Sequence, residues 1–250
     1  MKIKKLLFAA TILFTYGIFA QDLFPPVEVI EGTFKGQTIP LRDFPTMIVD
    51  FNDPREITIV PNESNTVQQE NTTTTVIQNL QTEPGNIMTY ALEQNFIGAS
   101  QSESGFLPPD PTGAVGPNHY VHSVNSLVKI FDKTGNLLVG PISLSAFLGN
   151  GSNGGDPIVL YDQLADRWLV SEFGVGNSLS IGVSVSNDPT GAYNVWDYGF
   201  SSLPDYPKYG VWHDGYYGTV NLGGFTTKGI ALDRAEMLAG GASPQILVFD

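Results

Sequence analysis

Short runs of alternating apolar and polar residues recur at a fixed interval in the second half of the chain. The stretches NHYVHSVN, DRWLVSEF and DGYYGTVN begin at Asn118, Asp166 and Asp214, and both steps are 48 residues long. Each run follows a turn residue and is too short for a helix, which is typical of β-strands. A period in the forties indicates an array of repeated structural units.

Each repeat predicts several short strands joined by tight turns. The first strand lies in TGAV, IVLY and KYGVW, and the repeated stretch itself forms the second. The third strand is predicted in LVKIF, SIGVSVS and GIALD, and the fourth follows a glycine turn as NLLVG or AYNVWDY in the first two repeats. In the third repeat DRAEMLAGG instead has a helical pattern that ends at two glycines.

Four strands in a repeat of this length are typical of a β-propeller blade. We therefore predict an all-β fold, a partial β-propeller of about three blades over residues 106–250, each with four antiparallel strands. The blades are expected at about 106–150, 151–202 and 203–250. Closed propellers have at least about four blades, so we expect the chain to be the N-terminal part of a longer polypeptide.

The first 20 residues predict a secretory signal peptide. Three lysines, Lys2, Lys4 and Lys5, precede an apolar stretch from Leu6 to Ala20. This stretch is shorter than the roughly 20 residues that span a bilayer, and no second candidate follows. We expect a secreted or cell-surface protein without a transmembrane segment after signal removal.

Two segments separate the signal peptide from the repeats. Residues 21–60 mix short apolar runs with prolines and predict an irregular β segment whose spacing does not match the repeat. Residues 61–105 begin with the polar tract NESNTVQQENTTTT and are expected to form a linker.

The charge of the chain narrows the class of partner. The formal net charge is -13, and removal of three lysines with the signal peptide lowers it to -16. An acidic surface repels phosphate backbones, so nucleic acid is not expected as a partner. The chain contains no cysteine, so its stability depends on packing without disulfides.

Aromatic side chains at the repeated position have two interpretations. Propeller blades are covered on both faces, so the adjacent Tyr216 and Tyr217 are expected to be buried against different neighbours. Alternatively, Trp168, Trp212, Tyr216 and Tyr217 offer rings on which a sugar stacks. Under this second interpretation the four residues form the candidate ligand-binding set.

Three aspartates begin the predicted innermost strands. If Asp110, Asp156 and Asp205 point toward the propeller axis, they form a ring of carboxylates, and Ca²⁺ prefers such oxygen ligands. The other interpretation is that each aspartate caps a turn, assisted by the proline that follows it or lies two residues further on.

The stretch Ser186 to Tyr193, SNDPTGAY, resembles the Asp box of sialidases and related propellers, with one extra residue before the glycine. The resemblance implies propeller architecture and not catalysis, because that box is a structural hairpin. In such a turn we expect Asp188 to accept backbone N–H bonds, Gly191 to adopt a positive φ and Tyr193 to cover the hairpin.

Residues 100 to 250 as a whole resemble the propeller region of large exported bacterial proteins carried by the type IX secretion system. The resemblance rests on PPDPTGAVGPNHYVHSVN, GDPIVLYDQLADRWLVSEF and DYPKYGVWHDGYYGTVN. It implies an exported protein.

Catalytic motifs are absent from the sequence. There is no Ser-His-Asp order, HExxH motif or phosphate-binding glycine loop, and His119 and His122 are expected on opposite faces of one strand. Sialidases bind a carboxylate with three arginines. Only two arginines, Arg167 and Arg234, lie within the repeats, so these repeats do not supply the full set. We therefore expect a binding or display module for glycans or cell-envelope polymers; the alternative is a sialidase-like glycan hydrolase completed by further blades.

Overall fold

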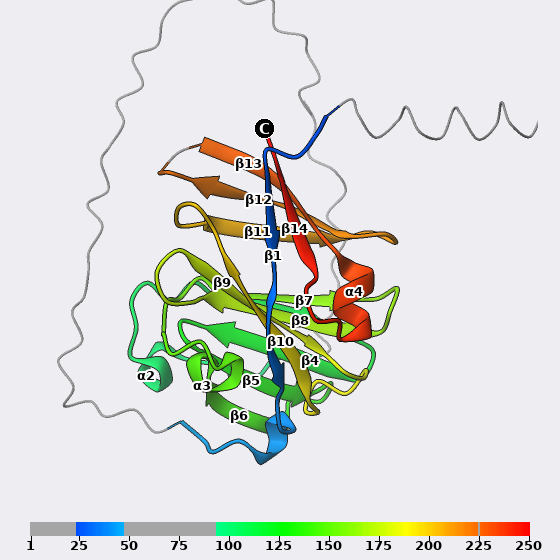
Figure 1. The fold of residues 1–250 in the computed structure, drawn as a ribbon. Coiled ribbons are helices and arrows are strands. Elements are labelled where there is room, and N and C mark those ends of the chain that lie inside the picture. The colour runs from blue at the N-terminus through cyan, green and yellow to red at the C-terminus, as the bar shows by residue number, and fades with distance from the viewer. Residues whose placement is uncertain (1–23, 48–93, 225) are drawn as a thin grey trace, which may run out of the picture.

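Three antiparallel sheets form the folded part of the chain (Figure 1). The computed structural model describes residues 24–47, 94–224 and 226–250. The predicted signal peptide and most of the predicted polar linker lie outside these residues. Among the described residues no helix is long and apolar enough to cross a membrane.

The sheets follow one another along the chain, and we call them blade 1, blade 2 and blade 3. Blade 1 contains β3 (Thr112–Val115), β4 (His119–Val124), β5 (Leu127–Asp132) and β6 (Leu137–Ser143). Blade 2 contains β7 (Ile158–Asp162), β8 (Arg167–Phe173), β9 (Ser178–Ser184) and β10 (Tyr193–Gly199). Blade 3 contains β11 (Asp205–Val211), β12 (Tyr216–Leu222), β13 (Thr226–Leu232) and β14 (Gln245–Phe249).

The repeated aromatic residue occupies the same place in every blade. It lies at the beginning of the second strand and pairs with a residue at or next to the end of the first strand. The pairs are Tyr120 with Val115, Trp168 with Tyr161, and Tyr216 with Val211. The 48-residue step therefore corresponds to a structural repeat, as the sequence predicts.

The first strands of the three blades converge. β7 contacts both β3 and β11, and the backbone N–H of Val159 on β7 donates to Oγ1 of Thr112 on β3 at 3.3 Å. Blade 2 is thus flanked on both faces, as in a propeller. The all-β partial propeller that the sequence predicts is confirmed, and the sheets do not close into a ring within the described residues.

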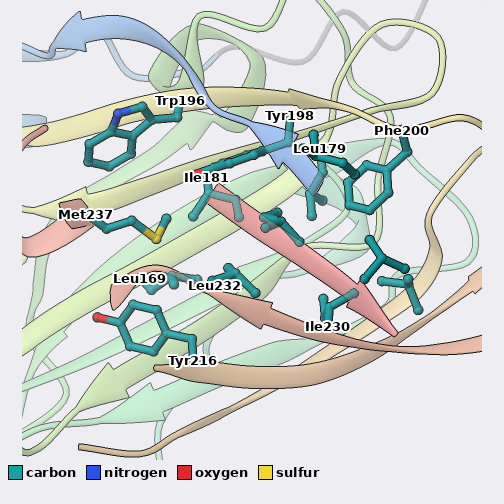
Figure 2. Packing of buried hydrophobic residues seen from close by; sticks show 14 of the residues in the cluster. Leu169, Leu179, Ile181, Trp196, Tyr198, Phe200, Tyr216, Ile230, Leu232 and Met237 are labelled. Carbon is teal, nitrogen blue, oxygen red and sulfur yellow. The ribbon is translucent and has the colours of Figure 1, made fainter. Parts of the chain in front are cut away.

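Apolar side chains fill the two spaces between blades. One cluster joins blades 1 and 2, with Val121 and Ile130 facing Trp168 and Val170. The other joins blades 2 and 3 and contains Leu169, Ile181, Tyr216 and Ile230 (Figure 2). Because β8 contributes to both clusters from alternate residues, this strand is buried on both faces.

The N-terminal segment, predicted to be an irregular β segment, supplies a fifth strand to two blades; its pairing with these blades was not predicted. β1 (Glu28–Glu31) pairs with β14 at the outer edge of blade 3, and β2 (Thr33–Gln37) pairs with β10 of blade 2 (Figure 1). Gly32 connects them, and a Cβ at this residue would lie 2.9 Å from the Pro244 carbonyl oxygen and from the ring of Tyr198. Only glycine passes between the two blades here.

The same segment continues to blade 1. Its 3₁₀ helix η1 (Leu41–Asp43) buries Leu41 in the cluster between blades 1 and 2, and the Met47 N–H donates to the Pro141 carbonyl. Residues 24–47 therefore cross all three outer edges in reverse order. β1 and β2 thereby become the outermost strands of blades 3 and 2, while β6 remains the outermost strand of blade 1.

Residues 94–105, predicted to be linker, pack against the face of blade 1 that points away from blade 2. Phe96 lies against Tyr120 and Phe131, and the Ala99 N–H donates to Nδ1 of His122 at 2.9 Å. The short helix α2 (Gln101–Ser104) brings Glu103 to 2.8 Å from the buried Lys129 ammonium. This end of the array is covered by the chain itself.

Two further helices connect or complete the blades. α4 (Arg234–Ala239) matches the predicted helical pattern, because Asp233 accepts from the Glu236 N–H and Gly240 ends it at a φ of 70°. α3 (Leu144–Leu148), between blades 1 and 2, was not predicted; Ser143 caps it and Gly149 ends it.

Candidate binding pocket at the first strands

A pocket of about 520 Å³ lies where the first strands of the three blades begin. Its size falls within the range of about 300 to 1,000 Å³ that is typical of small-molecule sites. Its polar and aromatic lining comes from all three blades and consists of Asp110, Thr112, Asp156, Tyr206, Lys208 and Tyr209. Pro111, Pro157 and residues 158–160 complete the wall.

An unusual backbone conformation recurs beside the pocket. Asp110, Asp156 and Tyr206 have φ values of 38°, 51° and 52°, and each precedes a proline. Proline disfavours the right-handed helical region for the residue before it, and aspartate tolerates a positive φ better than most residues. Tyr206 is therefore the structural equivalent of the two aspartates. The sequence alignment that gave this place to Asp205 was wrong by one residue.

Asn125 links the two aspartates across blades 1 and 2. Its Nδ2 donates to Oδ2 of Asp110 at 2.6 Å and to the Pro108 carbonyl at 2.9 Å. Its Oδ1 accepts from the backbone N–H of Asp156 at 2.9 Å. The amide thus fixes the position of both aspartates before any ligand enters.

The carboxyl groups of Asp110 and Asp156 are paired. Burial, followed by the charges of Asp110 and Asp205 and a hydrogen bond that the protonated Asp156 carboxyl donates to Asp110, raises the pKa of Asp156 to about 6. The neighbouring Lys208 acts in the opposite direction. Below about pH 6 the Asp156 carboxyl therefore holds a proton, which gives the pocket a hydrogen-bond donor.

Blade 3 contributes the aromatic and cationic part of the pocket. Tyr206 is 61% exposed, and the Lys208 ammonium lies 4.2 Å from the centroid of its ring. The sequence analysis did not include Asn125, Tyr206 or Lys208 among the candidate site residues. The X-Pro dipeptide at the beginning of each blade was the sequence feature that could have indicated this site.

The calcium hypothesis for Asp110, Asp156 and Asp205 receives no geometric support. Within residues 24–47, 94–224 and 226–250, no three His, Asp or Glu side chains are grouped closely enough to hold a metal ion. Oδ2 of Asp110 already accepts from Asn125, and the backbone N–H of Asp156 donates to the same asparagine side chain. Calcium binding stays a prediction.

The aromatic candidates divide into two buried and two accessible residues. Trp168 is 1% exposed and donates from Nε1 to the Asn187 carbonyl, and Tyr216 is 0% exposed and donates to Asp162. Their burial corrects the hypothesis that a ligand stacks on them. Trp212 is 59% exposed and Tyr217 45% exposed, at the other end of β11 from the pocket.

Tyr217 also corrects the expectation that both adjacent tyrosines are buried. In blades 1 and 2 the equivalent residues face the next blade. Among the described residues no sheet covers this face of blade 3, so Tyr217 remains half exposed.

The turn between β9 and β10 has most of the expected interactions. Oδ1 of Asp188 accepts from the Thr190 N–H at 2.9 Å, and the Tyr193 hydroxyl donates to the Pro189 carbonyl at 3.1 Å. The prediction of a positive φ at Gly191 was wrong, because the extra residue lets a Gly191 N–H to Asp188 carbonyl bond close the turn instead. No residue of this turn lines the pocket.

Both arginines within the repeats are structural. Arg167 donates to the Ala165 and Asp166 carbonyls of its own turn. Arg234 donates from Nε to the buried carboxylate of Asp162 at 2.6 Å. Neither lines the pocket.

The fully buried Glu172 on β8 is a polar group that sequence analysis missed. Oε2 accepts from Nδ2 of Asn150 at 3.2 Å and Oε1 from the Gly155 N–H at 3.4 Å. Burial outweighs these bonds and raises the pKa of Glu172 to about 7. Its apolar neighbours in the sequence WLVSEF gave the only signal that this glutamate points inward.

The chain matches no known protein family, no curated protein and no solved structure at a significant level. The function proposed below therefore rests on the sequence and on the geometry of the pocket.

Proposed function

We propose that this protein is an exported β-propeller module that binds carbohydrate, as free glycan or cell-envelope polymer, in the pocket at the first strands. The observation that carries this proposal is the convergence of paired carboxyls, a lysine and an exposed tyrosine ring from three blades on one pocket.

This combination of groups suits a sugar. Adjacent hydroxyls of a sugar donate to carboxylate oxygens and accept from a protonated carboxyl or an ammonium group. The apolar face of a sugar ring packs on an aromatic ring such as Tyr206.

The resemblance to exported propeller proteins supports a place outside the cytoplasm. The lysine-rich and apolar first 20 residues support secretion, and the type IX route is part of the proposal. Measurement of the N-terminal residue of the protein recovered from culture medium or cell surface tests this part. Recovery of the intact N-terminus from the cytoplasm would contradict it.

A glycan array probed with the chain from Gln21 onward tests the binding function. Bound glycans are then titrated against Asp156→Asn, which keeps the shape of the side chain and removes its titratable proton. We expect at least a tenfold loss of affinity, since hydrogen bonds to charged groups contribute about 1.5 to 3 kcal/mol. Asp43→Asn is the matched control, because Asp43 is exposed on η1 and outside the pocket. Equal affinity for the Asp156 variant and the wild type would refute the assignment.

One observation favours glycan hydrolysis as a second candidate. Glycosidases need two carboxyl groups, one of which has a raised pKa, and Asp156, whose pKa is raised to about 6, lies beside Asp110. Chromogenic glycosides separate the two functions. Turnover that disappears in Asp110→Asn and Asp156→Asn supports the hydrolase, whereas binding without turnover supports the module.

A further inference from the structure

Glu172 lies behind the pocket, at the contact between blades 1 and 2. Its side chain is 0% exposed and continues the row of Trp168 and Val170, which face blade 1. The carboxyl does not line the pocket, so the binding site described above makes no direct use of it. Burial of an ionisable side chain costs free energy, which calls for an explanation.

The carboxyl fastens the segment 150–155, which connects α3 to β7, to the end of β8. Oε1 of Glu172 accepts from the Gly155 N–H at 3.4 Å, and Oε2 accepts from Nδ2 of Asn150 at 3.2 Å. Phe173 adds to both contacts, because its N–H donates to the Gly155 carbonyl at 3.2 Å and its carbonyl accepts from Asn150 at 3.3 Å. Both ends of the segment are thus bonded to two consecutive residues of β8.

This segment leads directly into the pocket. Asp156 follows Gly155, and its N–H donates to Oδ1 of Asn125 at 2.9 Å. Gly155 has a φ of 86°, and a Cβ at this residue would lie 3.2 Å from the same Asn125 oxygen. The position of Gly155 therefore decides whether the Asp156 backbone meets Asn125, which in turn holds Asp110.

Glu172 also adjoins the other partner of that bond. Ser126 follows Asn125 in the chain, and its buried hydroxyl finds no hydrogen-bond partner of normal geometry within the described residues. The hydroxyl nevertheless lies close enough to Glu172 to lower the pKa of the carboxyl. One buried carboxyl is thus next to the residue before Asp156 and to the residue after Asn125.

The groups that surround this carboxyl are neutral donors. They do not offset its burial, so the pKa of Glu172 is raised to about 7. A charged side chain on the same face of blade 2, Asp197, lies two strands away and is paired with Lys35 at 3.1 Å. Above pH 7 Glu172 therefore lowers the stability of the fold. Ionisable groups of this kind are concentrated at functional sites.

We propose that Glu172 is a positioning residue of the pocket, which holds Gly155 so that the Asp156 backbone stays bonded to Asn125 before a ligand enters. The consequence for ligand affinity rests on the carbohydrate-binding function proposed above. The positioning itself does not, and it is measurable in the free protein.

Hydrogen exchange of single backbone amides, measured by NMR at pH 6 on the chain from Gln21 onward, tests the positioning. At this pH the Glu172 carboxyl is mostly protonated, so Glu172→Gln keeps a neutral side chain of the same shape with an acceptor for the Gly155 N–H. Glu172→Met fills a similar volume without that acceptor. We expect the Asp156 N–H to exchange at least about tenfold faster in Glu172→Met than in the wild type, and less than about threefold faster in Glu172→Gln.

The amide of Val183, an interior residue of β9, reports the overall stability in the same spectra. Equal acceleration at Val183 and Asp156 would show that the substitution only destabilises the fold, and would overturn the proposal. An unchanged Asp156 amide in Glu172→Met would overturn it too, as would equal acceleration in the two variants.

The affinity for a glycan that the wild type binds on the array completes the test. We expect Glu172→Met to bind at least about fivefold more weakly than Glu172→Gln, because the aspartates lose their fixed position. A faster Asp156 amide with unchanged affinity would overturn the role of Glu172 in binding. If the wild type binds no glycan, the proposed function fails, and the exchange rates still decide whether Glu172 positions Asp156.

Discussion

Nε of Arg234, at the beginning of α4 in blade 3, lies 2.6 Å from Oδ2 of Asp162 on β7 of blade 2. The guanidinium also donates from Nη2 to Oδ1 of Asp162 at 3.2 Å, and from Nη1 to the His213 carbonyl. Asp162 is fully buried, and its remaining bonds come from the Leu164 and Ala165 N–H groups and the Tyr216 hydroxyl. One carboxylate thus joins two blades.

Removal of this arginine should be strongly destabilising. Arg234→Met leaves the Asp162 carboxylate buried without its cation, for which we expect a loss of about 3 kcal/mol in the free energy of unfolding. Urea unfolding followed by tryptophan fluorescence measures this loss. Arg167→Met removes only bonds to carbonyls of its own turn and should cost less than about 1 kcal/mol. Equal effects of the two substitutions would contradict the structural role of Arg234.

The glycine between β1 and β2 should tolerate no side chain. A methyl group at Gly32 would lie 2.9 Å from the Pro244 carbonyl oxygen and from the Tyr198 ring, so Gly32→Ala is expected to cost about 1 to 3 kcal/mol. Gly199→Ala is the control, since no atom lies within 4 Å of its added Cβ. If thermal unfolding shows the two variants to be equally stable, residues 28–37 do not cross between blades as described.

The pH dependence of stability should change when Glu172 is neutralised. Its pKa is about 7 in the folded state against an ordinary value of 4.5, so the folded state binds the extra proton between these values. The stability contributed by Glu172 is therefore fully present below about pH 4.5 and is lost as pH rises through 7, by about 3 kcal/mol. Glu172→Gln should remove this loss and be more stable than the wild type at pH 8. A difference between the two that does not vary from pH 5 to pH 8 would disprove the assignment.

Calcium should leave the melting temperature unchanged if the aspartates at the first strands only form turns. Under that interpretation the two aspartates serve only their bonds with Asn125, and melting curves with excess Ca²⁺ and with chelator coincide within about 1 °C. A rise of several degrees that disappears in Asp110→Asn would instead establish the metal site.

Local patterns in the sequence predicted the strands within each blade. Alternation and turn residues placed β4, β8 and β12, and Asp233 with Gly240 placed α4. These features depend on neighbouring residues, so their signals are short-range. The equivalence of Tyr120, Trp168 and Tyr216 was also predictable, because this position packs in the same way in each blade.

Features that depend on distant partners were not predictable in this way. β1 pairs with β14 more than 200 positions further along the chain, and the spacing of residues 21–60 does not match the repeat. Tyr217 is exposed because no sheet of the described residues covers its side of blade 3, and no local sequence pattern indicates this. At the pocket, a one-residue difference in spacing placed Asp205 where the structure has Tyr206.

A double-mutant cycle between Tyr216 and Asp162 tests the packing of consecutive blades most directly. The Tyr216 hydroxyl donates to Oδ2 of Asp162 at 3.0 Å across the contact between blades 3 and 2. Urea unfolding of Tyr216→Phe, Asp162→Asn and the double variant should give a coupling energy of about 1 to 2 kcal/mol. Additive effects within about 0.5 kcal/mol would show that the repeated aromatic of blade 3 does not reach blade 2.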